Sequence, residues 1–431
     1  MPPDSMNPVS MNPVSTNPAS TNPASTNPAS TNIDSIDVTA VRADTPACEH
    51  LLHLNNAGTS LPPAIVLERV KAHLDLEATI GGYEAAERTE DEHERIYKNL
   101  ARMLGCSAGE IALVDSSTRA WDAAFYAFAQ RFERGDVILT ASNEYVSNYI
   151  ALLQMVRQRG VRIEVVPSET NGEISLPALE AAIATHKNRG KLIALTHVPT
   201  NGGLVQPAAA VGRIARRHGI AFLLDACQSA GQMPLNVAEL GCDMLSATGR
   251  KYLRGPRGTG FLYVRQSLLE QLEPPMLDMR SANWTAPNQY EIRGDARRFE
   301  TWEFSLACRL GMGVAVEYAL ALGLDRIQAR VAALGEMLRG GLEKIPGITV
   351  RDLPGSGHPR AGIVTFTHAR LTPQEIRARL SEQKINVWTT STEGTRLDME
   401  ARNLTEMVRA SVHYYNTEKE LERVCRVLAA L

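Results

Sequence analysis

Two ionisable side chains stand at the ends of two apolar runs in the segment 223–264. Asp225 ends the first run, and Lys251 follows the second run inside a stretch of small, polar and basic residues. An aspartate and a lysine in this arrangement can form a structural ion pair. However, Thr248 and Arg250 directly precede the lysine and GPRGTG follows it, and hydroxyl, flexible backbone and guanidinium groups are those that bind a phosphate. The segment therefore offers an amine, a carboxylate and an anion site.

A second anion-binding candidate lies earlier in the chain. Ser117 and Thr118 begin an apolar-periodic stretch that extends to residue 128, and the free N–H groups at a helix N-terminus favour an anion. Neither segment contains a Walker A loop or a GxGxxG dinucleotide fingerprint. A lysine, an aspartate and two phosphate sites without a nucleotide motif indicate pyridoxal phosphate. That cofactor requires a Schiff-base lysine, a carboxylate at its pyridinium nitrogen and a phosphate anchor.

The elements that must position these residues alternate between strand and helix. The pattern predicts a helix between several pairs of successive strands. It therefore predicts an α/β fold with a mostly parallel central sheet and helices on both faces. The predicted strands are 136–141, 161–168, 191–198, 220–227, 242–249 and 260–265, and the predicted helices include 147–160, 175–188 and 207–219. Only ten residues join the last two strands, which favours an antiparallel strand there. Ligands bind beyond the carboxyl ends of such strands, where His197, Thr200, Asp225 and Thr248 fall.

The chain divides into three predicted parts. Residues 6–30 repeat MNPVS twice and TNPAS three times, and proline at every fifth position with almost no apolar residue predicts a disordered tail over 1–45. A large cofactor-binding domain is expected over 46–315. After about residue 315 a long helical pattern leads into shorter strands and helices, which predicts a smaller C-terminal α+β domain over 316–431.

Composition excludes several classes of partner. The formal net charge is −3, so nothing indicates a nucleic-acid or membrane-surface partner. No apolar run approaches the roughly 20 residues that span a bilayer, and the N-terminus does not resemble a secretory signal. The six cysteines are scattered without a CxxC pair or a cluster at zinc spacing. We therefore expect reduced thiols, a cytoplasmic protein and no metal site.

Over about residues 50–425 the sequence resembles the class V aminotransferase superfamily of fold-type I pyridoxal phosphate (PLP) enzymes, which includes cysteine desulfurases, isopenicillin-N-epimerase-like proteins and C–S lyases. LLDACQSAGQMPLNV resembles the family's Asp-x-x-Gln strand. This implies that Asp225 pairs with the pyridinium N–H and that Gln228 hydrogen-bonds the phenolate oxygen. SATGRKYLRGPRGTG implies that Lys251 is the Schiff-base residue, with Thr248 and Arg250 where the family usually has serine and histidine phosphate ligands.

The resemblance extends to the rest of the cofactor site. SSTRAWD is similar to the family's phosphate turn, which implies that Ser117, Thr118 and the backbone at Arg119 bind the phosphate. NEYVSN resembles the stretch whose residue after glutamate stacks on the cofactor ring; that residue is often histidine and is Tyr145 here. THVPTNGGLVQP implies that Thr200, or Asn201, approaches the ring oxygen.

The resemblance also implies a substrate site and a homodimer. VRASVHYYNTEKEL is similar to the segment whose arginine binds the substrate carboxylate, which is Arg409 here, and Asn56 is a second substrate-binding candidate. Active sites are expected at the subunit boundary, with the segment 277–304 reaching across. In the family, a Gly-Thr pair from the other subunit contacts the cofactor phosphate. Trp302 and Glu303 stand at these positions here, so Trp302 or Thr301 is the candidate replacement for that contact.

The reaction outcome stays open among several fates of an amino-acid substrate. The family chemistry at Cα and Cβ runs through an external aldimine and a quinonoid. Residues 387–409 contain no cysteine, so a persulfide-forming desulfurase is not expected. We expect a lyase that acts by β-elimination, including C–S cleavage. The alternatives are an aminotransferase and an epimerase, the latter with Tyr145 or His197 as a second proton donor. A non-enzymatic scaffold is disfavoured because residues 1–45 cannot form a helix-turn-helix.

Simple structural roles compete with several of these assignments. Gln228 can cap a helix, Tyr145 can be ordinary core packing, and Arg409 can be a solvated charge at a helix end. His197, just inside a strand end, is better read as a structural histidine than as an acid–base catalyst.

Overall fold

The computed structural model describes residues 36–355 and 359–431, which belong to one compact unit. Most of the tail expected over 1–45 lies outside the described residues. Its last part is folded, however: helix α1 (Val38–Ala43) begins after Asp37, whose side chain accepts a hydrogen bond from the backbone of the helix. The predicted end of the tail at residue 45 is therefore too late. A short capped helix forms there because Val41, 3% exposed, packs into the core.

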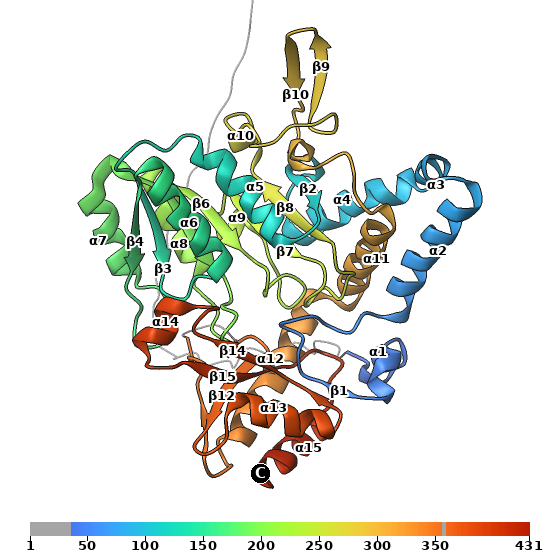
Figure 1. The fold of residues 1–431 in the computed structure, drawn as a ribbon, viewed down its shortest axis with the longest axis vertical. Helices are drawn as coiled ribbons and strands as arrows, with labels where there is room; N and C mark the ends of the chain where they lie inside the picture. Colours follow the sequence, from blue (N-terminus) through green and yellow to red (C-terminus); the bar gives the residue numbers. More distant parts are fainter. Residues whose placement is uncertain (1–35, 356–358) are drawn as a thin grey trace, which may run out of the picture. The chain divides into compact units, whose positions relative to one another are not determined.

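The central sheet joins seven strands of the described chain in the order β2-β8-β7-β6-β5-β3-β4 (Figure 1). The five strands β3 to β7 pair with one another in parallel. Strand β8 is antiparallel to both of its neighbours, β7 and β2. The bounds are β2 Ile111–Val114, β3 Val137–Ala141, β4 Arg162–Val166, β5 Gly190–Thr196, β6 Ala221–Asp225, β7 Met244–Thr248 and β8 Gly260–Val264. All six predicted strands are confirmed, including the antiparallel one, and β2 is an additional edge strand.

Both faces of this sheet are buried under helices. Along β3, Val137 and Leu139 belong to one apolar cluster and Ile138 belongs to another, as expected for a sheet covered on both faces. The helices of this part are α2 Ala64–Ile80, α3 Gly82–Arg88, α4 Glu90–Leu104, α5 Ser117–Ala129, α6 Val146–Arg159, α7 Leu176–His186, α8 Ala208–His218, α9 Val237–Leu240 and α10 Gln266–Leu269. Short 3-10 helices are Pro46–Glu49, Ala108–Glu110, Lys187–Arg189 and Ala296–Phe299.

A second, antiparallel sheet has the strand order β11-β12-β15-β14. Its strands are β11 Ile348–Val350, β12 Ile363–His368, β14 Trp388–Ser391 and β15 Glu406–Ser411. The helices of this part are α12 Leu324–Leu342, α13 Pro373–Glu382, α14 Arg396–Ala401 and α15 Glu418–Ala429. Strand β1 (Leu52–His53) pairs in parallel with β13 (Ile385–Asn386), so the start of the folded chain joins this C-terminal part.

The predicted domain boundary at residue 315 falls inside helix α11 (Leu306–Leu322). This helix packs on α2 and α4, and the chain then bends by 81° into α12. Gly323, with φ of +86°, separates the two helices. The apolar pattern continues through residue 315, so the helix cannot end there, and the bend at Gly323 is the physical division. Taken singly, none of the helices in the described ranges is long and apolar enough to span a membrane; α11 and α12 reach that length and composition only as a bent pair.

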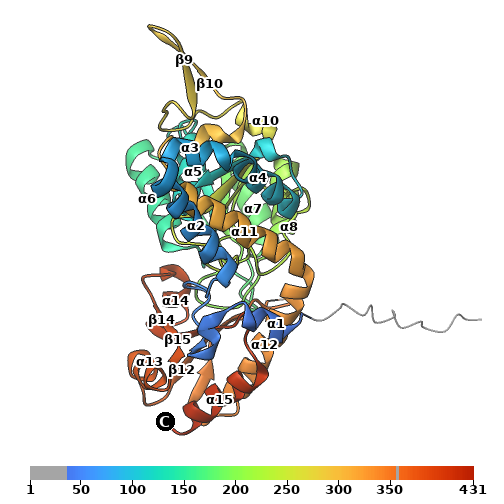
Figure 2. The same ribbon diagram turned by 90° about the vertical axis from the view of Figure 1, so that its right-hand side faces the viewer.

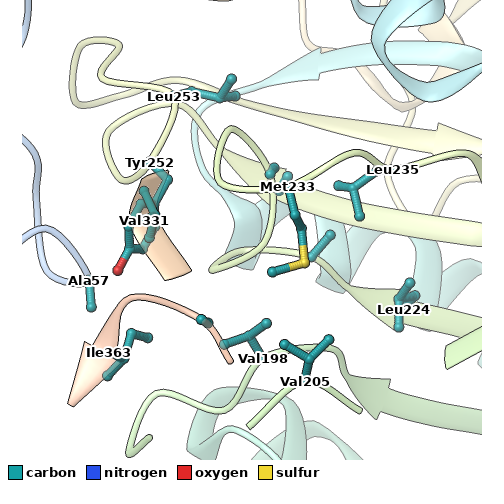
Figure 3. Close-up of a cluster of buried hydrophobic side chains, with 14 of the residues drawn as sticks. Ala57, Val198, Val205, Leu224, Met233, Leu235, Tyr252, Leu253, Val331 and Ile363 are labelled. Atoms are coloured by element: carbon teal, nitrogen blue, oxygen red, sulfur yellow. The ribbon is translucent and has the colours of Figure 1, made fainter. Parts of the chain in front are cut away.

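Buried side chains connect the lysine loop with the C-terminal part (Figure 3). Tyr252 and Leu253, directly after Lys251, belong to the same apolar cluster as Val331 of α12 and Ile363 of β12. All four of these side chains are at most 2% exposed. The loop is therefore held by the core between the two sheets.

A hairpin projects from the first part of the fold (Figures 1 and 2). Strands β9 (Ala282–Ala286) and β10 (Gln289–Ile292) pair only with each other. Trp284 is 81% exposed and Tyr290 is 54% exposed. The hairpin lies within the segment predicted to reach across a dimer.

Candidate active site

A cavity lies at the carboxyl ends of β5, β6 and β7. The lining residues are Ser116, Ser117, Thr118, Tyr145, Asn148, Thr196, Val198, Thr200, Asp225, Cys227, Gln228, Thr248, Arg250 and Lys251. The predicted lysine, the predicted aspartate and both predicted phosphate segments therefore face one cavity, at the rim that the strand pattern indicated.

Asp225 is the last residue of β6, and it is buried at 4% exposure. Its Oδ1 accepts a hydrogen bond of 2.8 Å from the backbone N–H of Cys227, and its Oδ2 accepts one of 2.9 Å from Nδ2 of Asn148. Burial raises the pKa of the Asp225 carboxyl, whereas these hydrogen bonds and the charge of Lys251 oppose that rise. A second cation in the cavity would favour the ionised carboxylate further.

The phosphate end is built at the N-terminus of α5. Ser116 caps the helix, and its Oγ accepts a hydrogen bond of 3.2 Å from the backbone N–H of Arg119. The backbone at Arg119 is therefore used within the fold, and its side chain does not line the cavity. Ser117 Oγ donates to Ser246 Oγ at 3.3 Å. A Cβ at Gly260 would lie 2.7 Å from the backbone of Ser116, so glycine is needed where β8 passes this turn.

The lysine loop is held from three sides. Thr248 donates to the carbonyl of Thr259 at 3.1 Å, and Arg250 donates to the carbonyl of Gly58. The carbonyl of Tyr252 lies 3.1 Å from Nε2 of His413. Burial lowers the pKa of His413 well below its ordinary value. Because its Nδ1 accepts the N–H of Tyr414, the neutral ring carries its proton on Nε2 and donates to Tyr252.

Arg409 lies on β15 and is 7% exposed. Its Nη1 donates to Oγ1 of Thr200 at 2.6 Å and to the carbonyl of Thr200 at 3.2 Å, and its buried Nε has no partner. Burial lowers the pKa of its guanidinium to about 10. None of the ion pairs among the described residues includes it. Arg409 is therefore a buried cation and not a solvated charge; it does not line the cavity itself but is bonded to Thr200, which does.

Two amides near the cavity differ in their roles. Gln228 donates from Nε2 to the carbonyl of Ala57 at 3.1 Å, and its buried Oε1 has no partner. Asn56 is fully buried, donates to the carbonyl of Ser411 at 2.7 Å and accepts from the hydroxyl of Tyr415. It does not line the cavity. The structure therefore shows that the amide of Asn56 is used within the fold, and its contact with substrate stays a prediction.

Of the other predicted residues, some line the cavity and some lie outside it. Tyr145 lines the cavity just before α6, and its stacking on a ring stays a prediction. His197 lies outside the cavity lining, with Nδ1 at 3.0 Å from Oγ of Ser229, which supports its structural role. Asn201 donates to Asp398 at 2.7 Å, so Thr200 is the residue of this loop that reaches the cavity. Trp302 is 46% exposed and outside the cavity, and its contact across a dimer stays a prediction.

Sequence reasoning missed four polar residues of the lining: Ser116, Asn148, Thr196 and Cys227. Each lies within or beside a quoted motif. Ser116 precedes the expected helix start as a capping serine, which is a readable signal. Cys227 stands inside the Asp-x-x-Gln segment, and Asn148 follows Glu144 by one helical turn. Thr196 has no such signal, because its role depends on which strand lies beside it.

The residues present fit PLP. An amine and a buried carboxylate face one cavity, and three hydroxyl-bearing residues line it at the N-terminus of a helix of 13 residues. Gln228 Oε1 and Arg409 Nε are buried polar atoms without a partner in the protein. Such atoms are costly unless a ligand or water meets them.

Comparison with known proteins agrees with this site. The family described as Aminotransferase class-V matches residues 52–424. A protein named probable cysteine desulfurase from Pyrococcus abyssi is 27% identical over 397 residues, which cover 91% of this chain and 96% of the relative. One from Methanothermobacter thermautotrophicus is 28% identical over 389 residues, 89% of this chain and 95% of the relative.

A solved structure of a cysteine desulfurase from Thermococcus onnurineus, described as the apo form, has a TM-score of 0.85 and 26% identity, and the match covers 91% of this chain and 97% of that one. The chain therefore belongs to the class-V aminotransferase family of PLP enzymes, as its motifs predicted.

Proposed function

We propose that the protein is a PLP-dependent lyase that breaks the bond between Cβ and a leaving group, such as sulfur, in an amino-acid substrate. The observation that carries the proposal is that Lys251, Asp225 and the Thr200 partner of Arg409 meet at one cavity. The segment 387–409 packs nearby, since the N–H of Val146 donates to the carbonyl of Gly394 at 3.1 Å, and it contains no cysteine. Lys251 can serve as the base and Arg409 as the site for the substrate carboxylate, whereas the segment 387–409 offers no thiol.

Each residue has a role that follows from its position. Bound PLP supplies an electron sink for the pair released at the substrate Cα. Asp225 would hold the proton on the ring nitrogen, and the amine of Lys251 would take the Cα proton as general base. Ser117, Thr118 and the N-terminus of α5 would hold the phosphate, with Thr248 and Arg250 on its other side.

Arg409 would bind the substrate carboxylate. Its buried guanidinium has an unpartnered Nε and is anchored through Nη1 to Thr200. A planar guanidinium suits bidentate recognition of a carboxylate. A carboxylate fixed in this way decides which bond at Cα lies perpendicular to the ring, and therefore which bond breaks.

A cysteine desulfurase is the second candidate, favoured by the names of the similar proteins. In that reaction an enzyme thiol takes the substrate sulfur and the remainder leaves as alanine, so no external oxidant is consumed. Of the six cysteines, all within the described ranges, Cys227 is the one that lines the cavity. In β-elimination, by contrast, cysteine and water give pyruvate, ammonia and hydrogen sulfide.

Product analysis separates the two reactions. The purified protein is incubated with cysteine, cystine and S-alkyl cysteines, with Lys251→Ala as the inactive control. The proposal predicts pyruvate and ammonia in equal amounts and no sulfur added to the protein mass. Alanine, together with a protein heavier by one sulfur atom, identifies a desulfurase and overturns the proposal. Amino transfer to an added keto acid, or inverted configuration with exchange in D₂O, identifies an aminotransferase or an epimerase instead.

We also infer that the enzyme acts as a homodimer in the cytoplasm. The exposed aromatic residues of the β9–β10 hairpin support a protein contact there, because aromatic residues are enriched at interfaces. The six cysteines are all free thiols, which supports a reducing compartment.

A further inference from the structure

A second buried carboxyl lies behind Asp225. Glu144 is 4% exposed, precedes Tyr145 and does not line the cofactor cavity. Its Oε1 accepts hydrogen bonds from the hydroxyl of Thr196, from the backbone N–H of Tyr145 at 2.9 Å and from Nδ2 of Asn148 at 2.8 Å. Its Oε2 accepts from Thr140 at 3.3 Å. Every partner of this carboxyl is therefore a donor.

One amide nitrogen joins Glu144 to Asp225. Nδ2 of Asn148 donates to Glu144 at 2.8 Å and to Oδ2 of Asp225 at 2.9 Å. An amide nitrogen has two hydrogens, so each carboxyl receives one of them. If the amide turned over, its oxygen would face two carboxyl groups and both hydrogen bonds would be lost. Glu144 and Asp225 together fix the orientation of Asn148.

The charges of the two carboxyls are supported in different ways. Burial raises the pKa of Glu144 and that of Asp225. Lys251 faces Asp225 from the cavity, whereas Glu144 takes part in none of the ion pairs in the described ranges. Its burial is offset by hydrogen bonds alone. Retaining a carboxyl at this cost requires a purpose beyond packing, and its bridge to Asp225 offers one.

We propose that Glu144 is a positioning residue that acts through Asn148 to hold Asp225 in the orientation that pairs with the ring nitrogen of PLP. This inference rests on the role proposed for Asp225. Without the Glu144 acceptor, the Asn148 amide is free to turn its carbonyl towards Asp225 or to release it. Asp225 then loses one of its two donors, and the cofactor loses an oriented carboxylate without losing Lys251.

The test is a titration of apoprotein with PLP, read as the dissociation constant and the visible absorption band of the bound cofactor. Glu144→Met keeps roughly the size of the side chain and removes both acceptor oxygens. We expect an affinity lower by about tenfold and a shifted band, while borohydride still attaches the cofactor to Lys251. Asp243→Leu is the matched control, because Asp243 is a buried carboxyl directly before β7 that accepts the N–H of Phe222 at 2.9 Å and lies outside the cavity. It should bind PLP as the wild type does, and thermal unfolding of each apoprotein checks the fold.

A double-mutant cycle shows whether Glu144 acts through Asn148. In the Asn148→Ala background, Glu144→Met should have no further effect on affinity or absorption. A full additional effect there means that Glu144 acts through Tyr145, and it overturns the proposal. Wild-type affinity and absorption in Glu144→Met overturn it as well. If Asp225→Ala also binds PLP unchanged, the role of Asp225 fails too, whereas a defect in Asp225→Ala alone limits the failure to Glu144.

Discussion

Arg409 donates a hydrogen bond of 2.6 Å from Nη1 to Oγ1 of Thr200, although the two residues are 209 positions apart. Arg409 belongs to strand β15 of the antiparallel sheet, and Thr200 follows β5 of the central sheet. The contact therefore joins a buried cation of the C-terminal part to the rim that holds Asp225 and Lys251. The role proposed for Arg409 in substrate binding depends on this contact between the two sheets.

Arg409→Lys and Arg409→Ala test the carboxylate site. Lysine keeps a charge but loses the planar fork, so both variants should raise KM for amino acids, by about 10- to 100-fold in the alanine variant. kcat should also fall, because the Cα bond is no longer aligned. Steady-state kinetics with an amino acid and with its decarboxylated amine provide the measurement. An unchanged KM in Arg409→Ala removes this residue from the substrate site.

The pKa of Arg409, which burial lowers to about 10, predicts a pH limit for substrate capture. The guanidinium is charged below that pH and neutral above it. Because kcat/KM reports the free enzyme, its value for carboxylate substrates should fall as the pH passes about 10. The fall should be absent from the residual activity of Arg409→Gln. If the variant shows the same alkaline limb, another group causes it.

Asp225→Asn should keep the fold and lose most of the activity. The amide is close in size to the carboxyl but cannot hold a positive charge on the ring nitrogen, so the loss appears mainly in kcat. Rapid mixing of the variant with substrate, followed at the cofactor absorption, measures the slow step. Normal turnover in this variant contradicts the electron-sink assignment.

His413 predicts an acid-sensitive fold. Burial, aided by the charge of Arg254, lowers its pKa well below the ordinary value, so the folded protein keeps it neutral while the unfolded chain takes up a proton below about pH 6.5. Stability is therefore fully present above that pH and falls as pH decreases towards the folded pKa. The slope contributed by one such proton is about 1.4 kcal/mol per pH unit.

Urea unfolding between neutral and acidic pH measures this slope. His413→Gln should unfold more easily at neutral pH and show a shallower decline towards acid. His50→Gln, at an exposed position, is the matched control and should follow the wild type. An equally steep decline in His413→Gln means that other histidines, such as the half-buried His93 with its pKa lowered by burial to about 4, account for it.

The β9–β10 hairpin predicts an association surface. Trp284 is 81% exposed, and removing its ring with Trp284→Ser should weaken the proposed homodimer because aromatic side chains dominate interface energies. Sedimentation of wild type and variant over a range of concentrations measures the change. If the wild type is a monomer, or if the variant dimerises equally well, the hairpin is not the association surface.

The alternation of strand and helix made most of the central sheet predictable. Strands β3 to β8 have strong apolar runs, and short-range signals such as the connection before Gly260 indicated the antiparallel β8. Helix α1 was missed because a proline-rich repeat precedes it, Val41 is its one buried residue, and the contact of Arg42 with Glu420 spans most of the chain. The boundary at residue 315 was wrong because the helix signal continues to Gly323.

The cofactor site was predictable where motifs carry it and not where tertiary contacts do. Lys251 and Asp225 were found because their motifs are contiguous in sequence. Asn148 and Glu144 act across a strand end on Asp225, and nothing in the local sequence shows that they meet it. The hydrogen bonds of Asn56 to Ser411 and Tyr415 could not be predicted either, because both partners lie far away in the chain.

The most direct test of the account is reduction of the PLP-loaded protein with borohydride, followed by peptide mass analysis. The account predicts a reduced cofactor attached to the ε-amine of Lys251, and a preparation of Lys251→Ala that carries no covalent cofactor. Attachment to another lysine, or a wild-type protein that takes up no PLP at all, would contradict it.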